Sequence, residues 1–561
     1  MYNNFSEFLP RTKHTEQLVA DIKRAASEYK SVPIESLSHS KFEYVLTTGR
    51  KRESYEEDYI EHRRRLSTFL IMALYEDDPV YIEELQNILW AVCDEFTWCV
   101  PAHARAVTGE NLTQKLMTII DLFAAETAFY LSEAIYLTKR RISKLVYDRV
   151  EYEIKRRVIN PFIEGNVRWA KNNWSGVCAS SIGVSMIYLG MDKEFSASQN
   201  HLSECINGFL DSYEDDGCCK EGPLYWEYGF GFFCYYARLV REYTGGKINY
   251  FSIPKVKKIA QYGENVFLKN NNVIPFSDAP HELNYNIGLH TFLAKEYGLP
   301  SLSEKYECKF GDDIRYRICH MIRNLFWYDE AFLQNIPEQK KYIYYEDAMW
   351  YINTKNDAYC FAAKGGNNDE PHNHNDLGGF IVYDNGSYII DDLGWPMYDA
   401  GYFEADRYNF ICASSKGHSV PQIDNTEQTT GSAGFAKLIS ASEDKFEIDL
   451  SKAYSTAENV YRKFYFYPER IILEDEFSGE NNEITERFIT RIKPIIEKDN
   501  CVKIDNWTIT CCDSAEVSVI KTEFKPRNNI VKSSMNDTEH AFLIDFKLKK
   551  DKNTVKFIIS K

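Results

Sequence analysis

The sequence lacks the features that would place the chain in a membrane or direct it across one. Residues Met1 to Pro10 contain no basic stretch followed by an apolar one, and no apolar run approaches the roughly 20 residues that span a bilayer. We therefore expect no membrane association. The expected location is cytoplasmic, or periplasmic or secreted if a signal peptide has been removed.

Cysteine is present without any of its diagnostic spacings. There are 14 cysteines, including the adjacent pairs Cys218-Cys219 and Cys511-Cys512, but no Cys-x-x-Cys and no regular framework. This pattern favours reduced, mostly buried thiols over disulfides.

Positive charge is in deficit. The 66 Lys and Arg residues against 83 Asp and Glu give a net charge of −17, which argues against nucleic acid as a partner. An acidic substrate would need a local basic cleft. Three basic clusters, at 63–65, 139–141 and 155–157, lie in helical patterns and are interpreted as solvated helix faces.

Length and aromatic content are ample. A chain of 561 residues is too long to fold around a single hydrophobic core and indicates two or three domains. Aromatic residues make up 15%, with 39 Tyr and 9 Trp, which suits clefts that stack on sugars as well as large cores.

Hydrophobic spacing divides the chain in two. From about residue 15 to 335 the period is helical, as in Val146, Val150, Ile154 and Val158, without a fixed sequence repeat. This half predicts stacked helices, in either a solenoid or a closed ring of helical hairpins.

After about residue 340 the period becomes two. Asn385-Gly386 between alternating apolar residues predicts a type I′ hairpin. Strands without intervening helices predict an antiparallel β-sandwich, with a boundary between 334 and 342, near Pro337, and domains 1–336 and 337–561. The further predicted strands are Phe446–Leu450, Tyr461–Tyr467, Arg470–Glu474, Ile489–Ile496, Trp507–Cys511, Val517–Ile520, His540–Leu548 and Thr554–Ile559.

The stretch from Pro371 to Gly379 holds two histidines directly before the hairpin. In an extended segment His372 and His374 point the same way, so both imidazoles can face one site. The pair Asp391-Asp392 and the later His418 are the natural further ligands, which predicts a mixed histidine and carboxylate site of the kind Zn²⁺ accepts.

Two loops interrupt the helical half. Residues 171–174 (Lys-Asn-Asn-Trp) and 216–229 combine Gly, Pro and polar residues with aromatics, and such loops often line sites. Taken singly, Asn172 or Asn173 is explained as a helix cap and Tyr225 as a packing residue.

Taken in order, these elements resemble the heparinase II/III group of polysaccharide lyases. The shared pattern is an Asn-Asn loop, then the Glu221-Gly-Pro-x-Tyr-Trp-x-Tyr-Gly loop, then His372-x-His-x-Asp before a hairpin, then Asp392-x-Gly and a turn containing His418. Trp98, Pro101 and His103 also resemble an early segment of the group, and the ordered match spans nearly the whole chain.

The resemblance implies a multidomain α-then-β fold. It consists of an N-terminal (α/α) toroid, an incomplete helical barrel, followed by a C-terminal antiparallel β-sandwich. The implied reaction is β-elimination in a uronic-acid-containing glycan, either a glycosaminoglycan such as hyaluronan, chondroitin or heparan sulfate, or alginate. The partner is then an acidic polysaccharide or oligosaccharide, with no organic cofactor, and with a monomer or a dimer equally open.

The resemblance also implies catalytic roles. Asn173, or alternatively Asn172, would stabilise the substrate carboxylate during removal of the C5 proton. Tyr225, or alternatively Tyr228, would transfer a proton at the glycosidic oxygen and, depending on substrate stereochemistry, at C5. His372 would be the base or the neighbour that makes such a tyrosine effective, because the ordinary tyrosine pKa is about 10.

By the same resemblance, His374, Asp392 and His418 would bind a structural metal, usually Zn²⁺, with Asp391 as the competing carboxylate. Where many relatives have His after the Asn-Asn pair, this chain has Trp174. The implied substrate-binding set is Asn172, Trp174, Glu221, Tyr228, Trp98 and His103, with Arg407 as a clamp for a substrate carboxylate.

Two other functions remain open. A glycoside hydrolase on a helical toroid would need two carboxylates flanking the bond, for which Asp216 and Glu221 are the motif candidates. An inactive carbohydrate-binding scaffold would bind oligosaccharide and would not depend on the Tyr225 hydroxyl.

Overall fold

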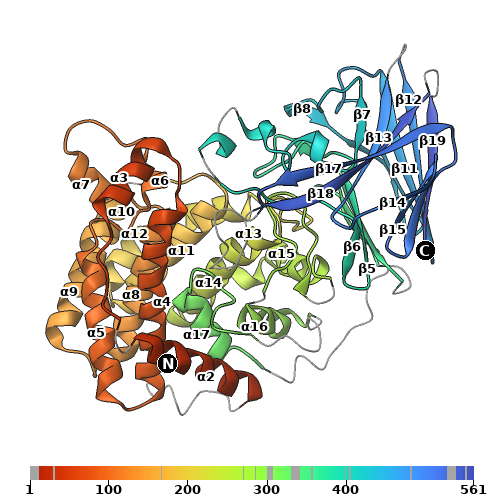
Figure 1. Cartoon of the computed structure of the whole chain (residues 1–561). Coiled ribbons are helices and arrows are strands. Elements are labelled where there is room, and N and C mark those ends of the chain that lie inside the picture. The colour runs from red at the N-terminus through yellow and green to blue at the C-terminus, as the bar shows by residue number, and fades with distance from the viewer. Residues whose placement is uncertain are drawn as a thin grey trace. The chain divides into compact units, whose positions relative to one another are not determined.

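The computed structural model describes residues 12–29, 32–165, 167–268, 271–284, 286–299, 308–329, 342–354, 358–398, 400–403, 406–479, 483–526, 538–549 and 553–561. Its contacts divide the chain into two compact units (Figure 1). The helical unit comprises residues 1–213, 225–260 and 284–336, and the β-unit comprises 214–224, 261–283 and 337–561. The boundary predicted near Pro337 lies outside the described residues.

The helical unit is built from amphipathic helices around a few that are buried on all sides. In α8 and α11 nearly every residue is buried, and a helix that is apolar all round belongs in an interior. α11 packs against α8, α12 and α14, and α4 packs against α5. The helices are α2 (Lys13–Glu28), α3 (His39–Thr48), α4 (Glu53–Tyr75), α5 (Pro79–Asp94), α6 (Pro101–Ala104), α7 (Leu112–Met117), α8 (Leu122–Thr138), α9 (Lys144–Ile154), η2 (Lys155–Ile159), α10 (Asn160–Gly165), α11 (Asn173–Tyr188), α12 (Asp192–Leu210), α13 (Pro223–Tyr225), η3 (Trp226–Phe230), α14 (Gly231–Tyr243), η4 (Tyr250–Ser252), α15 (Pro254–Asn265), α16 (Ile287–Tyr297) and α17 (Ile318–Phe326), of which α13 and α15 run into the β-unit.

The β-unit contains antiparallel sheets of eight, five and four strands and a two-stranded ribbon. Their orders are β14-β15-β16-β19-β12-β11-β10-β9, β1-β2-β3-β5-β6, β17-β18-β13-β7 and β4-β8. The strands are β1 (Tyr342–Tyr345), β2 (Trp350–Asn353), β3 (Cys360–Lys364), β4 (Asn367–Asn368), β5 (Phe380–Asp384), β6 (Ser387–Ile390), β7 (Pro421–Ile423), β8 (Gly431–Phe435), β9 (Lys437–Ala441), β10 (Lys445–Asp449), β11 (Asn459–Tyr467), β12 (Arg470–Ser478), β13 (Ile484–Thr490), β14 (Ile495–Lys498), β15 (Cys501–Ile504), β16 (Trp507–Cys511), β17 (Ala515–Phe524), β18 (Glu539–Leu548) and β19 (Thr554–Ser560), joined by short 3₁₀ turns η8 (Gly401–Phe403), η9 (Arg407–Asn409) and η10 (Ser415–Gly417).

Aromatic side chains fill the core of the sandwich. The ring of Phe464 on β11 lies 4.9 Å from that of Phe361 on β3 and 5.0 Å from that of Phe380 on β5, and Phe557 on β19 lies 5.1 Å from Phe488 on β13. The eight-stranded sheet therefore packs on both the five-stranded and the four-stranded sheet, as in a β-sandwich.

The α-then-β prediction is confirmed, and most strands agree to within a few residues. Asn385 and Gly386 have φ values of 49° and 92°, as a type I′ turn requires, and β5 and β6 pair across them. The strand predicted over Ile489–Ile496 is wrong. Pro494 interrupts it, so that β13 ends at Thr490 and β14 begins at Ile495.

The interpretation of the basic clusters as solvated faces is also wrong in part. Arg63 and Arg157 are each 3% exposed and pair with the buried carboxylates of Glu95 and Glu153. Pairing removes the cost that otherwise keeps a charge in water.

All 14 cysteines are free thiols, and 12 of them are buried. Over the part of the chain that the structure describes, no helix combines the length and apolar character needed to cross a membrane.

Candidate functional site

The predicted Asn-Asn loop opens helix α11. Asn172 is the N-cap residue, and its side chain accepts a hydrogen bond from the backbone N–H of Trp174 at 3.0 Å. Asn173, the first helical residue, is buried. A Cβ added at Gly229 would come within 2.9 Å of the Asn173 Cβ, so only glycine permits this approach. Asn172 thus has a capping task, whereas Asn173 lies against the loop that carries Tyr225.

The two candidate tyrosines lie where a short α-helix is followed by a π-helical turn. Tyr225 ends α13 and is half-buried, and the π-helical turn η3 begins at the next residue. π-Helical turns are frequent at functional sites.

Tyr228 is held within the helical unit. Its hydroxyl donates to Glu126, and the guanidinium of Arg317 lies 4.6 Å from the centre of its ring. Burial and the negative charge of Glu126 raise the pKa of Tyr228 well above its usual value. Tyr228 is therefore unsuited to accept a proton near neutrality.

His103 is tied to the helices on both sides of its ring. Its Nδ1 donates to Asp121 at 2.8 Å, its Nε2 accepts from Arg52 at 3.1 Å, and the ring lies 4.8 Å from that of Trp174. Burial lowers the pKa of His103 despite the nearby Asp121, in keeping with a neutral ring that donates at one nitrogen and accepts at the other. Trp98 is 1% exposed, so it offers no surface on which a sugar could stack.

In the β-unit the main polar centre is Asp278, whose side chain is completely buried. Its Oδ2 accepts from His372 Nδ1 at 2.5 Å and from the Tyr398 hydroxyl at 2.7 Å, and its Oδ1 accepts from His374 Nε2 at 3.1 Å and from the Tyr402 hydroxyl. Burial opposes ionisation of Asp278, but the hydrogen bonds from the two histidines outweigh it and hold the pKa of this carboxyl well below its usual range.

His372 occupies an unusual backbone conformation. Its φ is 57°, in the left-handed region, which costs a non-glycine residue about 1–3 kcal/mol and is concentrated at functional sites. The side chain is 20% exposed, and Nε2 lies 3.6 Å from Glu221. Burial lowers the pKa of His372, but the hydrogen bond to Asp278 outweighs it, and the net shift is upward.

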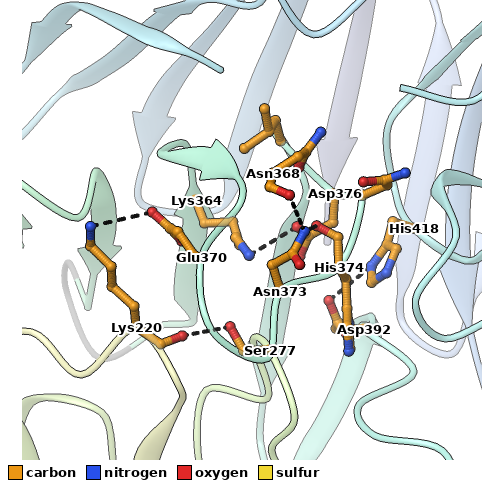
Figure 2. A network of polar contacts seen from close by, with 12 residues as sticks. Lys220, Ser277, Lys364, Asn368, Glu370, Asn373, His374, Asp376, Asp392 and His418 are labelled. Carbon is orange, nitrogen blue, oxygen red and sulfur yellow. Dashed lines mark hydrogen bonds and ion pairs between the residues drawn. The ribbon is translucent and has the colours of Figure 1, made fainter. Parts of the chain in front are cut away.

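His374, Asp392 and His418 form a group that could hold a metal ion, with one ligand atom from each residue and all three atoms within 4.8 Å of one another (Figure 2). His374 donates through Nε2 to Asp278 and His418 donates through Nε2 to the carbonyl of Cys412 at 2.7 Å. This fixes His374 in the tautomer that leaves its Nδ1 lone pair for a metal, whereas the Nδ1 of His418 lies 3.0 Å from Asp392 Oδ2, a second atom of the group. The Nδ1 of His374 is buried and has no hydrogen-bond partner among the described residues.

Asp391, the alternative carboxylate ligand, is engaged in other ion pairs. Asp391 pairs with His281 at 2.7 Å and with Arg491 at 3.2 Å. The clamp candidate Arg407 donates to the carbonyl of Asn373 at 2.7 Å and stacks 4.2 Å from the ring centre of Tyr402. In this conformation Arg407 braces the segment between the two histidines.

Buried charged side chains next to the candidate metal group hold the loops that carry His374 and His418. Lys364 and Asp376 form an ion pair of 2.9 Å with both side chains 1% exposed (Figure 2). Arg462, fully buried, donates to the carbonyls of Gly378 and Ser419, each at 2.9 Å. One guanidinium thus joins the loop after His374 to the loop after His418.

Sequence reasoning missed Asp278, Tyr398 and Tyr402. Asp278 lies 94 residues before His372, in a segment without a motif. The one available signal is the polar, proline-containing stretch 277–281, which interrupts the helical period.

Neither a protein-family model nor a curated protein matches the sequence. Solved structures do match. A heparinase III matches with a TM-score of 0.65 at 12% identity, over 99% of this chain and 84% of that one. Heparan sulfate lyase HepC from Pedobacter heparinus matches with a TM-score of 0.60 at 12% identity, over 97% and 88%. A Streptomyces coelicolor chondroitin AC lyase, in complex with chondroitin sulphate, matches with a TM-score of 0.56 at 8% identity, over 98% and 80%.

At these identities the matches establish the fold. The chain has the architecture of polysaccharide lyases that join a helical toroid to antiparallel β-sheets. The resemblance predicted from the motifs is confirmed at that level.

Proposed function

We propose that the protein is a polysaccharide lyase that cleaves uronic-acid-containing glycans by β-elimination. The observation that carries the proposal is His372, a histidine at φ 57° whose Nδ1 is held by the buried Asp278 and whose Nε2 lies 3.6 Å from Glu221. Such a strained, oriented and partly exposed imidazole in a chain with this fold supports a role in proton transfer or in stabilising charge.

In this proposal the predicted catalytic residues Asn173, Tyr225 and His372 have different tasks. Removing the C5 proton places further negative charge on the uronate carboxylate, and the amide of Asn173 would stabilise that charge. Asn173 begins α11, whose N-terminal dipole adds to the stabilisation. Either His372 would take the C5 proton, or Tyr225 would take it with His372 assisting. Tyr225 would then give a proton to the leaving glycosidic oxygen, so that the C4–O4 bond breaks as the C4=C5 double bond forms.

We further propose that His374, Asp392 and His418 hold a structural Zn²⁺. Two imidazoles and one carboxylate are a donor set that zinc accepts, and the unpartnered buried Nδ1 of His374 fits that use. Bound there, the ion would supply cross-linking between the loop of His374 and the loop of His418.

The proposed substrate class is supported by the neighbours. A heparan sulfate lyase and a chondroitin AC lyase share the fold, which favours a glycosaminoglycan, and alginate is the other uronate polymer to include. Trp174, half-exposed beside His103, would contribute a stacking surface.

The test is absorbance at 232 nm, where the unsaturated product absorbs, with hyaluronan, chondroitin sulfate, heparan sulfate, heparin and alginate. Tyr225→Phe and His372→Ala are compared with Tyr152→Phe and His540→Ala, matched changes at exposed positions. A rise in wild type and both controls that is lost in both test variants supports the proposal. No rise with any polymer or its oligosaccharides, in zinc-replete protein, overturns it.

The hydrolase alternative is weakened by Asp216. Its Oδ2 accepts from the backbone N–H groups of Asp347 and Ala348 at 2.9 and 3.1 Å, and its Oδ1 accepts from that of Cys218 at 2.8 Å. A carboxylate so engaged holds turns together and is unsuited to be a catalytic acid. The inactive scaffold is tested by the same experiment, since it would bind oligosaccharide without any rise in absorbance.

A further inference from the structure

Asp278 is the most heavily engaged carboxylate near the two histidines, and neither motif nor spacing gives it a role. We propose that Asp278 is a positioning residue that fixes His372 and His374 together, so that binding of a divalent cation at His374 and the orientation of the His372 imidazole are coupled. The inference rests on the proposed function for the catalytic part of His372, and on geometry for the coupling.

The carboxylate is saturated. An ionised carboxylate has about four lone-pair positions, and Asp278 receives four donors, two on each oxygen. The hydroxyls of Tyr398 and Tyr402 hold the carboxylate in place, and its side chain is fully buried. Neither oxygen can turn without breaking two hydrogen bonds.

The two imidazoles are bound through opposite nitrogens. His372 uses Nδ1, which directs its Nε2 away from Asp278. His374 uses Nε2, which leaves its buried Nδ1 without a hydrogen-bond partner among the described residues. One carboxylate therefore decides which nitrogen each ring presents.

Coupling follows because the same rigid group holds both rings. His372 and His374 are two residues apart, and the φ of 57° at His372 gives the segment a conformation that depends on its surroundings. Arg407 also braces this segment through the carbonyl of Asn373. A cation that binds His374 would make its Nε2–H a stronger donor to the shared carboxylate, and this would change the hydrogen bond that His372 makes to the same carboxylate.

Asp278→Asn is the sharpest change. The amide keeps the size of the side chain but replaces one oxygen with an NH₂ donor. One of the two imidazole N–H groups then faces a donor and loses its acceptor. The matched control is Asp545→Asn, at a mostly buried aspartate of the β-unit that pairs with Arg487.

The first measurement is zinc affinity, by competition with a chromogenic chelator, alongside circular dichroism to establish folding. We expect a loss of about 10–100-fold in Asp278→Asn, the range found when a partner of a ligating histidine is removed, and wild-type affinity in Asp545→Asn. Wild-type zinc affinity in folded Asp278→Asn overturns the proposal.

The second measurement separates positioning from binding of substrate. Asp278→Asn should lower kcat by about 10²-fold, with KM changed by less than about threefold, because orientation of a proton-transferring group is used in the transition state. An effect confined to KM overturns the positioning role. If wild-type protein gives no absorbance at 232 nm, it is the proposed function that fails, and the coupling is still decided by the zinc measurements.

The third measurement uses the wild-type chain and covers the case in which Asp278→Asn does not fold. Ring-¹⁵N-histidine NMR, with His372 assigned from a His372→Gln variant, should show the His372 signals moving when zinc is added. Signals of His372 that do not respond to zinc overturn the coupling. In folded Asp278→Asn, zinc added to saturation should no longer move them.

Discussion

Each of the two units buries a carboxylate against an imidazole, and each completes the arrangement differently. In the helical unit, Glu95 accepts from His62 Nδ1 at 2.8 Å and binds both terminal nitrogens of Arg63. The other nitrogen of His62 is 2.7 Å from the carbonyl of Glu35. Every polar group of the imidazole is used by the protein, and the charge of the carboxylate is balanced by a guanidinium.

In the β-unit, Asp278 also receives imidazole N–H groups, but Arg407 approaches it only to 4.0 Å. The Nδ1 of His374 has no hydrogen-bond partner within the described ranges. The comparison teaches that burial beside a carboxylate does not define a functional histidine. His62 and His374 differ in whether the second nitrogen of the ring is already used by the protein.

The largest expected effect is on catalysis in the β-unit. His372→Ala should lower kcat/KM by about 10²–10⁴-fold, the usual contribution of a proton-transferring side chain. The variant should also unfold at a lower temperature, because the buried Asp278 carboxylate loses one of its four donors and alanine keeps the left-handed φ. Initial rates at 232 nm and circular dichroism melts check both. Equal losses of activity in His62→Ala, per folded molecule, would erase the distinction between the units.

The next effect is on stability in the helical unit. Glu95→Gln leaves the buried guanidinium of Arg63 without its charged partner, which costs about 3–5 kcal/mol. Hydrogen exchange of peptides from α4 and α5 should accelerate, with kcat per folded molecule unchanged. Unchanged protection in these helices would contradict the structural role assigned to Glu95.

Metal removal should act on the β-unit alone. Zinc at about 100 times its Kd stabilises a folded state by about 2.7 kcal/mol, so chelation should accelerate exchange around His374 and His418 and leave peptides around His62 unaffected. His374→Ala should abolish the difference made by the chelator. A zinc effect that persists in His374→Ala would place the metal elsewhere.

The smallest effect is the pH dependence of the helical unit. Burial opposes ionisation of Glu95, but Arg63 and His62 outweigh it and keep its pKa below its usual value. The stabilisation from the charged form is therefore complete above the unfolded pKa of about 4.3 and is lost as pH falls from there through the folded pKa. Urea melts from pH 7 to 3 should show the wild-type advantage over Glu95→Gln constant above about pH 5.5 and shrinking below about pH 4.3. A constant advantage down to pH 3 would contradict this.

Local patterns predicted the parts of the molecule that local physics determines. The Asn385-Gly386 turn and the alternation around it define a hairpin without help from the rest of the chain. The structure brings His374, Asp392 and His418 together as predicted. The expectation that the spacing places His372 at the same metal site is wrong, because a φ of 57° at His372 makes the segment non-extended and His372 binds Asp278 instead.

What could not be predicted depends on distant pairing. Asp278 belongs to a segment that precedes the β-strands in sequence and packs with them in space. The division of labour between Asp391 and Asp392 likewise depends on His281 and Arg491, which lie about 100 residues away on either side. No periodicity carries such information.

The left-handed backbone at His372 has a consequence for how this protein would evolve in the laboratory. Glycine and asparagine adopt a φ of 57° at less cost than histidine. Relief of the left-handed φ therefore favours His372→Gly and His372→Asn by up to about 1 kcal/mol, against the loss of the hydrogen bond to Asp278. In a library screened for thermal tolerance without a turnover step, enrichment of glycine over alanine at position 372 would measure the backbone strain, because both residues lack the imidazole.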